Sequence, residues 1–290
     1  MINLLQSIER LSVFVFLLSS MLGAGLSLSL RGLAAPLSQV RLVLLALLLN
    51  FLFAPAFAWL LTIVIPLERG HAIGLLLLAG AAGAPFLPKL AETARGDIAF
   101  AVALMALLIC GTIVFMPFAL PLMIPGLQAD AWSIARPLVL FILLPLVVGM
   151  LIKSRAASFA ARLLPFLSIF SNGCLLLFFV LLVALNIRAL LGVLGSDAIL
   201  AAVLYVVGLF AGSWILSASM PKARGVLALG TAARNFGAAL APAVGTFTDR
   251  KIAVALIVNA IVGIVLSFLA AGWLRRKAVH LPEDSAFAPN

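Results

Sequence analysis

The chain has 290 residues, of which 65% are hydrophobic and only 10% are charged, and its mean hydropathy is +1.30. A soluble domain is usually about half apolar and about a quarter charged, so this composition excludes an ordinary soluble protein and indicates an integral membrane protein. The 19 Lys and Arg exceed the 9 Asp and Glu, but the cations stand singly between apolar runs, which argues against a nucleic-acid partner.

Nine apolar segments follow one another along the chain, and each is long enough to cross a bilayer as a helix. They lie near residues 12–30, 42–66, 72–94, 98–124, 134–152, 163–187, 198–219, 223–246 and 252–274. The expected fold class is therefore all-α: an integral membrane protein with about nine transmembrane helices in one domain, residues 1–277. We expect residues 278–290 to form a disordered tail.

Lys and Arg residues are distributed unequally between the two ends of these segments. Eleven fall on the side of the C-terminus and six on the side of the N-terminus, while Lys89 and Arg234 fall inside segments. Because cytoplasmic loops carry the excess of Lys and Arg, we expect the N-terminus outside and the C-terminus in the cytoplasm. The expected location is the cell membrane, which in a bacterium is the inner membrane.

Two of the segments are interrupted by glycine and proline, the third by Gly83, Pro85 and Pro88 and the eighth by Gly230, Gly237 and Pro242. If segment 134–152 is a connector, the interrupted segments are the third helices of two four-helix repeats, about 12–124 and 163–274, with inverted topology. Matched breaks of this kind indicate a transporter site, because half-helix N-termini attract anions and freed carbonyls attract cations. The alternative is that glycine and proline only permit close packing or a kink.

The two cations inside segments are candidate contacts for an anionic substrate. A Lys or Arg at the centre of a membrane helix costs about 2.5 to 3.5 kcal/mol unless a partner or water compensates it. Glu92 lies three residues after Lys89, on the same helix face, so we expect an ion pair between them. Glu92 is also the candidate for carrying a proton, and a purely structural ion pair is the alternative.

Enzymatic and metal-binding motifs are missing from the sequence. It contains neither HExxH nor a membrane-embedded GxGD motif, and Cys110, Cys174, His71 and His280 lie far apart. We therefore expect no catalytic residue, no metal site and no cofactor.

Five stretches, taken in order, resemble the bile acid:sodium symporter family: MLGAGLSL at 21–28, NFLFAPAFAW at 50–59, the Gly-rich stretch ending in ARGD at 80–97, ALGTAARNFGAAL at 228–240 and ALIVNAIVG at 255–263. The resemblance implies a secondary transporter of a small organic anion. It also implies a core domain, in which two helices cross at their broken midpoints, beside a panel domain. Asn235 and Asn259 match polar positions that line the family's binding cavity, although interhelical hydrogen bonds would also explain them.

The resemblance breaks down at the sodium sites, so the chain resembles a divergent, bacterial-type member of the family. Positions that match the first site are Pro88, Lys89, Ala101, Met105 and Gly230, and a one-residue gap leaves the register at Pro88 and Lys89 open. The second site matches Asn50, Arg234 and Gly230, so only Asn50 keeps a ligand.

A guanidinium or ammonium group beside the remaining oxygens would repel a sodium ion. We therefore expect an organic-anion carrier without ordinary sodium coupling. Three alternatives remain: sodium coupling through backbone carbonyls and Asn50, proton coupling through Glu92, and a channel or non-transporting receptor on the same fold.

Overall fold

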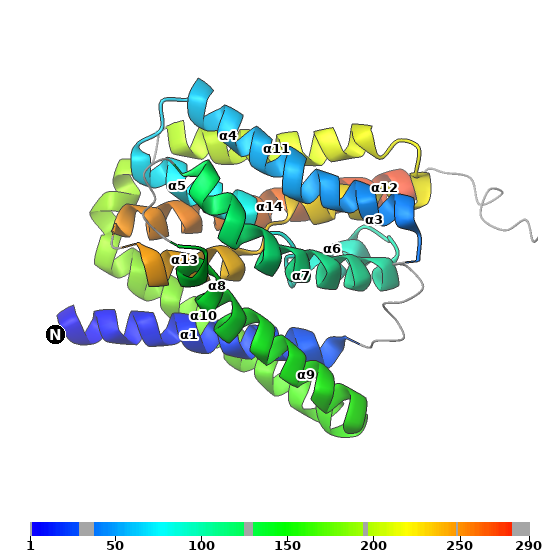
Figure 1. Ribbon diagram of the computed structural model, residues 1–290, viewed down its shortest axis with the longest axis horizontal. Coiled ribbons are helices and arrows are strands. Elements are labelled where there is room, and N and C mark those ends of the chain that lie inside the picture. Colours follow the sequence, from blue (N-terminus) through cyan, green and yellow to red (C-terminus); the bar gives the residue numbers. More distant parts are fainter. Residues whose placement is uncertain (1, 29–37, 125–129, 194–196, 248, 280–290) are drawn as a thin grey trace, which may run out of the picture.

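The computed structural model describes residues 2–28, 38–124, 130–193, 197–247 and 249–279, and all regular structure in these ranges is helical (Figure 1). The α-helices are α1 (Ile2–Ser27), α3 (Val40–Leu48), α4 (Ala54–Val64), α5 (Arg69–Gly80), α6 (Leu87–Thr93), α7 (Ile98–Met123), α8 (Ala131–Leu138), α9 (Leu144–Arg155), α10 (Ala157–Val193), α11 (Asp197–Leu216), α12 (Pro221–Ala232), α13 (Phe236–Thr246) and α14 (Arg250–Val279). Two π-helical segments, η1 (Leu49–Phe53) and η2 (Val139–Leu143), join α3 to α4 and α8 to α9. Residues 280–290 of the expected tail lie outside the described ranges.

Seven stretches are helices long and apolar enough to cross a membrane: Leu4–Ser27, Val40–Val64, Ile98–Met123, Ala131–Arg155, Ala157–Phe178, Asp197–Leu216 and Lys251–Lys277. The chain is therefore an all-α, multi-pass membrane protein. The expected segments 72–94 and 223–246 are each divided into two shorter helices, α5 with α6 and α12 with α13. The expectation of about nine spans counts each divided pair as one crossing.

Both π-helical segments end two residues before a proline. Pro55 and Pro145 are the second residues of α4 and α9, the helices that follow η1 and η2. Proline has no N–H to donate and its ring clashes with the carbonyl four residues earlier, and the wider π turn accommodates both effects without ending the helix. The π turn of η1 carries Asn50, a residue of the predicted site.

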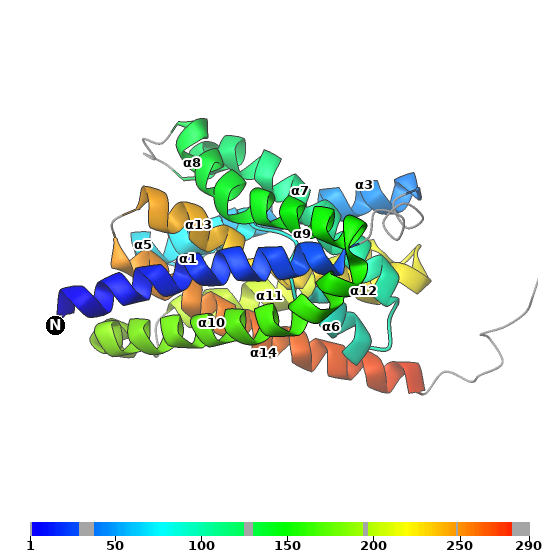
Figure 2. The ribbon, with the colours of Figure 1, turned by 90° about the horizontal axis from the view of Figure 1, so that it is seen from below.

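Helices α1, α9 and α10 form a layer along one side of the molecule, which we call the α1–α9–α10 layer (Figures 1 and 2). The interrupted helices lie between this layer and the opposite side, where α4 packs against α11 (Figure 1). Both views place the start of α1 and the end of α14 at opposite ends of the long axis. Residues 75–84 and 226–235, which include the second interruption and most of the first, are buried throughout.

Aromatic rings over glycines hold α4 and η1 against α11. A Cβ atom on Gly208 would overlap the ring of Phe57, and one on Gly212 would overlap the ring of Phe53. The two rings stack on each other with centroids 5.9 Å apart, and Phe57 also stacks on the buried Tyr205 at 6.2 Å. These contacts fix the position of η1, and therefore of Asn50, relative to α11.

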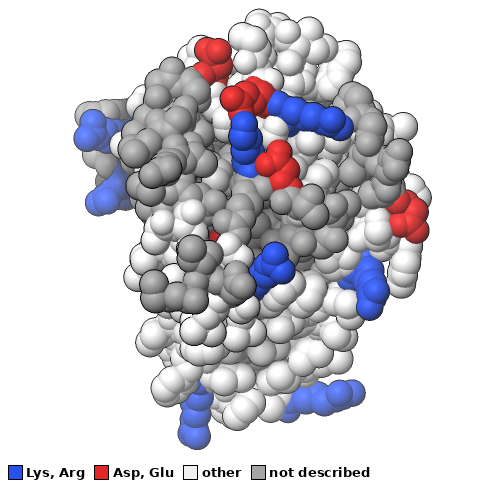
Figure 3. Space-filling view, turned by 90° about the vertical axis from the view of Figure 1, so that its left-hand side faces the viewer, with Lys and Arg blue, Asp and Glu red and all other residues white. Residues whose placement is uncertain are grey.

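An exposed ion pair joins the start of α5 to the start of α14. Lys251 Nζ lies 2.9 Å from Glu68 Oε2, and this ammonium lowers the pKa of the Glu68 carboxyl. Figure 3 shows positive and negative side chains gathered on the end of the molecule where α1 begins.

Candidate functional site

The two helix interruptions contact each other through Asn235. Its backbone N–H donates to the Ala81 carbonyl at 2.9 Å, and its Nδ2 donates to the Gly83 carbonyl at 3.0 Å. Its Oδ1 accepts from the N–H of Ala238 at 3.0 Å, which caps the N-terminus of α13. One side chain therefore ends the second interruption and fastens it to the first.

The first interruption has a second partner on α7. Thr112 Oγ1 accepts from the N–H of Ala82 at 2.8 Å and donates to the Ala82 carbonyl at 3.2 Å, so the hydroxyl replaces the helical partners that the break removes. Gly83 has a φ of +80°. A Cβ atom there would lie 2.7 Å from the N atom of Ile109, so both the backbone conformation and the close approach of α7 require glycine.

The buried side chain of Arg234 lies beside this contact between the two interruptions, which we call the crossing. Its Nε donates to the Leu78 carbonyl at 3.2 Å and its NH2 group to the Ala79 carbonyl, while NH1 donates to Asn50 Oδ1 at 2.8 Å and to the Thr231 carbonyl at 3.4 Å. Leu78 and Ala79 belong to the last turn of α5, whose carbonyls lack the donors of a continuing helix and carry the negative end of the helix dipole. The N–H of Ala81 also donates to the Leu78 carbonyl, at 3.1 Å. The guanidinium therefore caps α5 with a positive charge.

Asn50 completes this cluster. Besides accepting from Arg234, it donates from Nδ2 to the Ala46 carbonyl at 3.0 Å and to Thr231 Oγ1 at 3.3 Å. The hydroxyl of Thr231 in turn donates to the Leu227 carbonyl at 2.9 Å. Asn50, Thr231 and Arg234 thus link η1, α12 and the end of α5 in one buried hydrogen-bonded unit.

A cavity of about 310 Å³ lies between the α1–α9–α10 layer and the crossing. Its wall combines apolar and aromatic side chains with small polar ones: Phe16, Ser19, Ser20, Met21, Gly23, Ala24, Ser27, Pro85, Phe86, Leu164, Leu167, Ser168, Ser171, Asn172, Leu175, Asn235, Phe236, Gly237, Ala260 and Ile264. The first residues of α13 lie in this wall, and backbone N–H groups in a first turn have no helical acceptor. The cavity therefore faces the positive end of a helix, which favours an anion.

Of the four residues predicted to contact substrate, only Asn235 lines this cavity among the described residues. Arg234 points instead to α5 and Asn50. Asn259 on α14 is buried, and its Nδ2 donates to the Ala255 carbonyl at 2.8 Å while its Oδ1 has no hydrogen-bond partner in the described part of the chain. The structure thus joins Arg234 to Asn50, a predicted coupling residue, rather than to the cavity.

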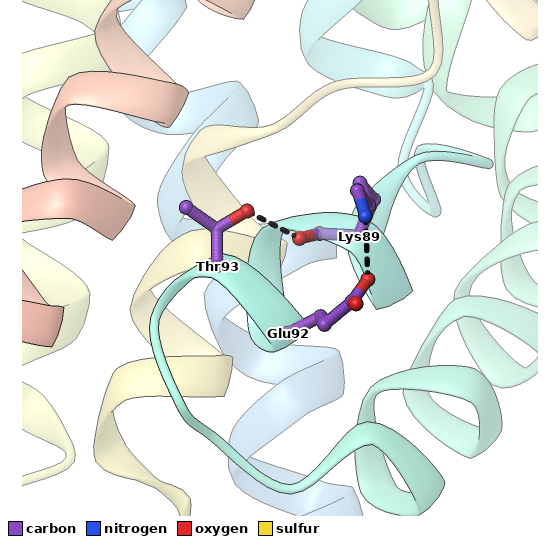
Figure 4. Close-up of polar contacts among 3 residues, drawn as sticks. All are labelled: Lys89, Glu92 and Thr93. Carbon is purple, nitrogen blue, oxygen red and sulfur yellow. Dashed lines mark hydrogen bonds and ion pairs between the residues drawn. The ribbon is translucent and has the colours of Figure 1, made fainter.

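Lys89 and Glu92 lie apart from both the cluster and the cavity. Their predicted ion pair is confirmed, with Nζ 2.8 Å from Oε2, and the carbonyl of Lys89 accepts from the Thr93 hydroxyl (Figure 4). The Lys89 side chain is 65% exposed, whereas Arg234 is 5% exposed, so only Arg234 is a buried cation. Lys89 lies in the first turn of α6, after the first interruption.

A second hollow, of about 430 Å³, lies along the same interface nearer the start of α1. It is lined by Gln6, Glu9, Arg10, Val13, Phe14, Phe178, Leu240, Ala243, Phe247, Asp249, Ile252 and Ala253. Phe178 of this hollow contacts Phe236 of the first cavity, with ring centroids 6.4 Å apart. An aromatic pair therefore stands between the two hollows.

Sequence reasoning missed several residues of this region. The Thr112 hydroxyl bonds to the first interruption and the Thr231 hydroxyl to Asn50. Each is a lone hydroxyl in an apolar helix, which carries no distinguishing signal. A signal did exist for Ser168, Ser171 and Asn172, because spacings of three and four residues put polar groups on one face of an apolar helix.

Comparison with known proteins supplies one match. Residues 14–193 match the sequence model of the sodium bile acid symporter family, which is more than half of the chain. The matched range runs from α1 to α10 and so includes Asn50 and the first interruption. No curated protein matches the chain.

Proposed function

The chain belongs to the sodium bile acid symporter family, and on that premise we propose that it is a secondary transporter that carries a small organic anion by alternating access, without ordinary sodium coupling. The observation that carries the proposal is the cavity at the start of α13, where a helix N-terminus faces an amphipathic wall. Binding sites in transporters with broken helices are commonly built this way.

We propose nine membrane crossings, in two inverted four-helix repeats separated by the α8–η2–α9 segment. Matching contacts support this: α5 packs against α4, α7 and α14, and α12 packs against α11, α14 and α7. The α1–α9–α10 layer is then the panel domain and the remaining helices form the core domain. Relative movement of the two would open the cavity to each side in turn.

The two hollows along the interface support alternating access. The smaller cavity reaches toward the end of α1 at Ser27, and the other lies near its start at Gln6. The contact between Phe178 and Phe236 stands between them, so separating these rings would join the two hollows. A carrier needs such a closable barrier on each side of its substrate.

A sodium ion does not fit the residues present at the family's second sodium site. The Asn50 oxygen that would serve as a ligand accepts from Arg234, and the carbonyls of Leu78 and Ala79 accept from the same guanidinium. A sodium ion would have to displace a covalently attached cation from these oxygens and remain beside it. We therefore propose that Arg234 holds the crossing together in place of an ion, and that Glu92 is the residue to test for proton coupling.

The proposal is tested in two steps with the purified full chain. A thermal-shift screen of organic acids is run in sodium chloride and in choline chloride, and the best ligand is radiolabelled for counterflow in liposomes. We expect equal affinity in the two salts and counterflow of the label. A tenfold or greater gain of affinity in sodium would overturn sodium independence and favour coupling through Asn50 and backbone carbonyls.

Other outcomes of these experiments would contradict the proposal that the protein is a carrier. Rapid flux without counterflow would identify a channel, and ligand binding without any flux would identify a receptor. Failure of every organic acid to bind would overturn the assignment of the cavity to an anion.

A further inference from the structure

The cavity wall contributed by α1 and α10 carries an unusual number of small polar side chains. They are Ser19, Ser20 and Ser27 from α1 and Ser168, Ser171 and Asn172 from α10. Two of them are already bonded within their own helix, because Ser19 Oγ donates to the Val15 carbonyl at 2.6 Å and Ser27 Oγ to the Gly23 carbonyl at 2.9 Å. These two hydroxyls are therefore accounted for by the fold.

Ser20, Ser171 and Asn172 are different, because their side chains make no hydrogen bond within the described part of the chain, and the same holds for the exposed Ser168. Ser171 is the most informative of the three, since only 5% of it is exposed although it borders the cavity. A buried hydroxyl without a partner is unfavourable, and an amide such as that of Asn172 is unfavourable against lipid. All three groups can be satisfied from the cavity.

The opposite wall offers no comparable free side chain among the described residues. The Asn235 amide is used on both sides, by the Gly83 carbonyl and by the N–H of Ala238. What remains there is the N-terminus of α13, where Gly237 reaches the cavity. The cavity wall therefore combines a helix N-terminus suited to a carboxylate, on the side of α13, with hydroxyl and amide groups from α1 and α10, and it also contains apolar side chains such as Met21 and Leu175.

From this arrangement we infer that Ser20, Ser171 and Asn172 select the substrate by binding a second polar group, so that the transported anion carries a hydroxyl or carbonyl group remote from its carboxylate. The inference rests on the proposed function. An acid without the second group would leave the buried Ser171 hydroxyl unpaired and would give the exposed Asn172 amide no partner in the cavity. Sites built to bond a hydroxyl discriminate strongly against analogues that lack it.

The test uses matched pairs of acids with the purified full chain: phenylacetate with its para-hydroxy derivative, and hexanoate with its omega-hydroxy derivative. Affinities are measured by isothermal titration. We expect the hydroxylated member of at least one pair to bind about tenfold tighter or more. In Ser171→Ala combined with Asn172→Leu, this preference falls to less than about twofold, and gel filtration checks that the variant is folded.

Ser12→Ala is the matched control, because Ser12 is a buried serine of α1 outside the cavity whose Oγ donates to the Ile8 carbonyl at 2.6 Å. It should keep the full preference. Equal binding of both members of each pair, or an equal loss for both in the double variant, would overturn this inference and leave the proposed anion carrier standing. Failure of every acid to bind would overturn both.

Discussion

At the scale of single residues, the least expected feature is a buried arginine whose four bonding partners are all neutral oxygens. Arg234 is surrounded by the carbonyls of Leu78, Ala79 and Thr231 and by the amide oxygen of Asn50. A buried cation in a membrane is costly unless it is well bonded, and carbonyls at a helix end are costly unless they find a donor. Two of these oxygens end α5, so the cation and the helix end satisfy each other.

Replacing this cation should therefore expose an oxygen-lined site. In Arg234→Gln, the Ala79 carbonyl loses its guanidinium donor, at about 1 to 3 kcal/mol for a buried unsatisfied group, and the Leu78 carbonyl keeps only the N–H of Ala81. We expect a lower melting temperature than the parent chain in choline chloride, and a partial recovery in sodium chloride, because sodium can now bind these oxygens. The parent chain should melt at the same temperature in both salts.

Arg224→Gln provides the control for loss of an arginine. Arg224 Nε donates to the Trp214 carbonyl at 2.6 Å, and its guanidinium lies 4.1 Å above the Trp214 ring, so it also has a bonded role but no oxygen cluster around it among the described residues. It should lose stability equally in both salts. A variant of Arg234 that is as stable as the parent, or that does not respond to sodium, would show that this guanidinium is not a substitute for an ion.

Part of this site could be predicted from the sequence for sound reasons. Arg234 and Asn50 match positions of the family's second sodium site, and they do bond to each other. The sequence could not show that Lys89 is exposed whereas Arg234 is buried, since the position of a residue within a repeat does not determine its burial. The free polar groups at Ser20 and Ser171 depend on which helices face each other, which composition does not reveal.

At the scale of helices, hydropathy locates the uninterrupted elements well, because a long apolar run in a bilayer has one available structure. The expected span 98–124 is observed as Ile98–Met123. The prediction that Gly230 and Pro242 interrupt the eighth segment is wrong, since Gly230 lies inside α12 and Pro242 inside α13. The actual break is set by the Asn235 cap and its bonds to the first interruption, which are tertiary contacts.

A close helix crossing gives a prediction at this scale. Helices α1 and α9 meet at Gly25 and Gly149, where a Cβ atom on Gly25 would overlap the Leu146 carbonyl oxygen and lie 3.0 Å from the Gly149 Cα. Gly25→Ala should therefore push the helices apart and lower the melting temperature, since helices pack closely in membranes through small residues. The melting temperature is measured by gel filtration of samples that have been heated to increasing temperatures.

Gly173→Ala tests whether the effect comes from the crossing. Gly173 lies inside α10, and a Cβ atom there would meet no neighbouring residue within 4 Å, so alanine should be neutral or stabilising by up to about 1 kcal/mol through helix propensity. Equal melting temperatures for the two variants would mean that α1 and α9 are not held by this contact.

At the scale of the whole molecule, the distribution of charge along the chain predicts an orientation in the membrane. Figures 1 and 2 place the start of α1 and the end of α9 at opposite ends of the long axis. Eleven Lys and Arg fall on the side expected to hold the C-terminus and six on the other. The positive-inside rule then puts the start of α1 outside and the end of α9 in the cytoplasm.

Cysteine labelling tests this orientation in a background with Cys110→Ala and Cys174→Ala. Ser7→Cys lies near the start of α1 and Ser154→Cys near the end of α9, and both side chains are exposed. A membrane-impermeant maleimide added to intact cells should label Ser7→Cys at once and Ser154→Cys only after lysis, because α1 through α9 would then comprise an odd number of crossings. The reverse pattern would invert the orientation and place the cavity's Ser27 end outside, whereas labelling of both from outside would mean that one interrupted pair does not cross the membrane.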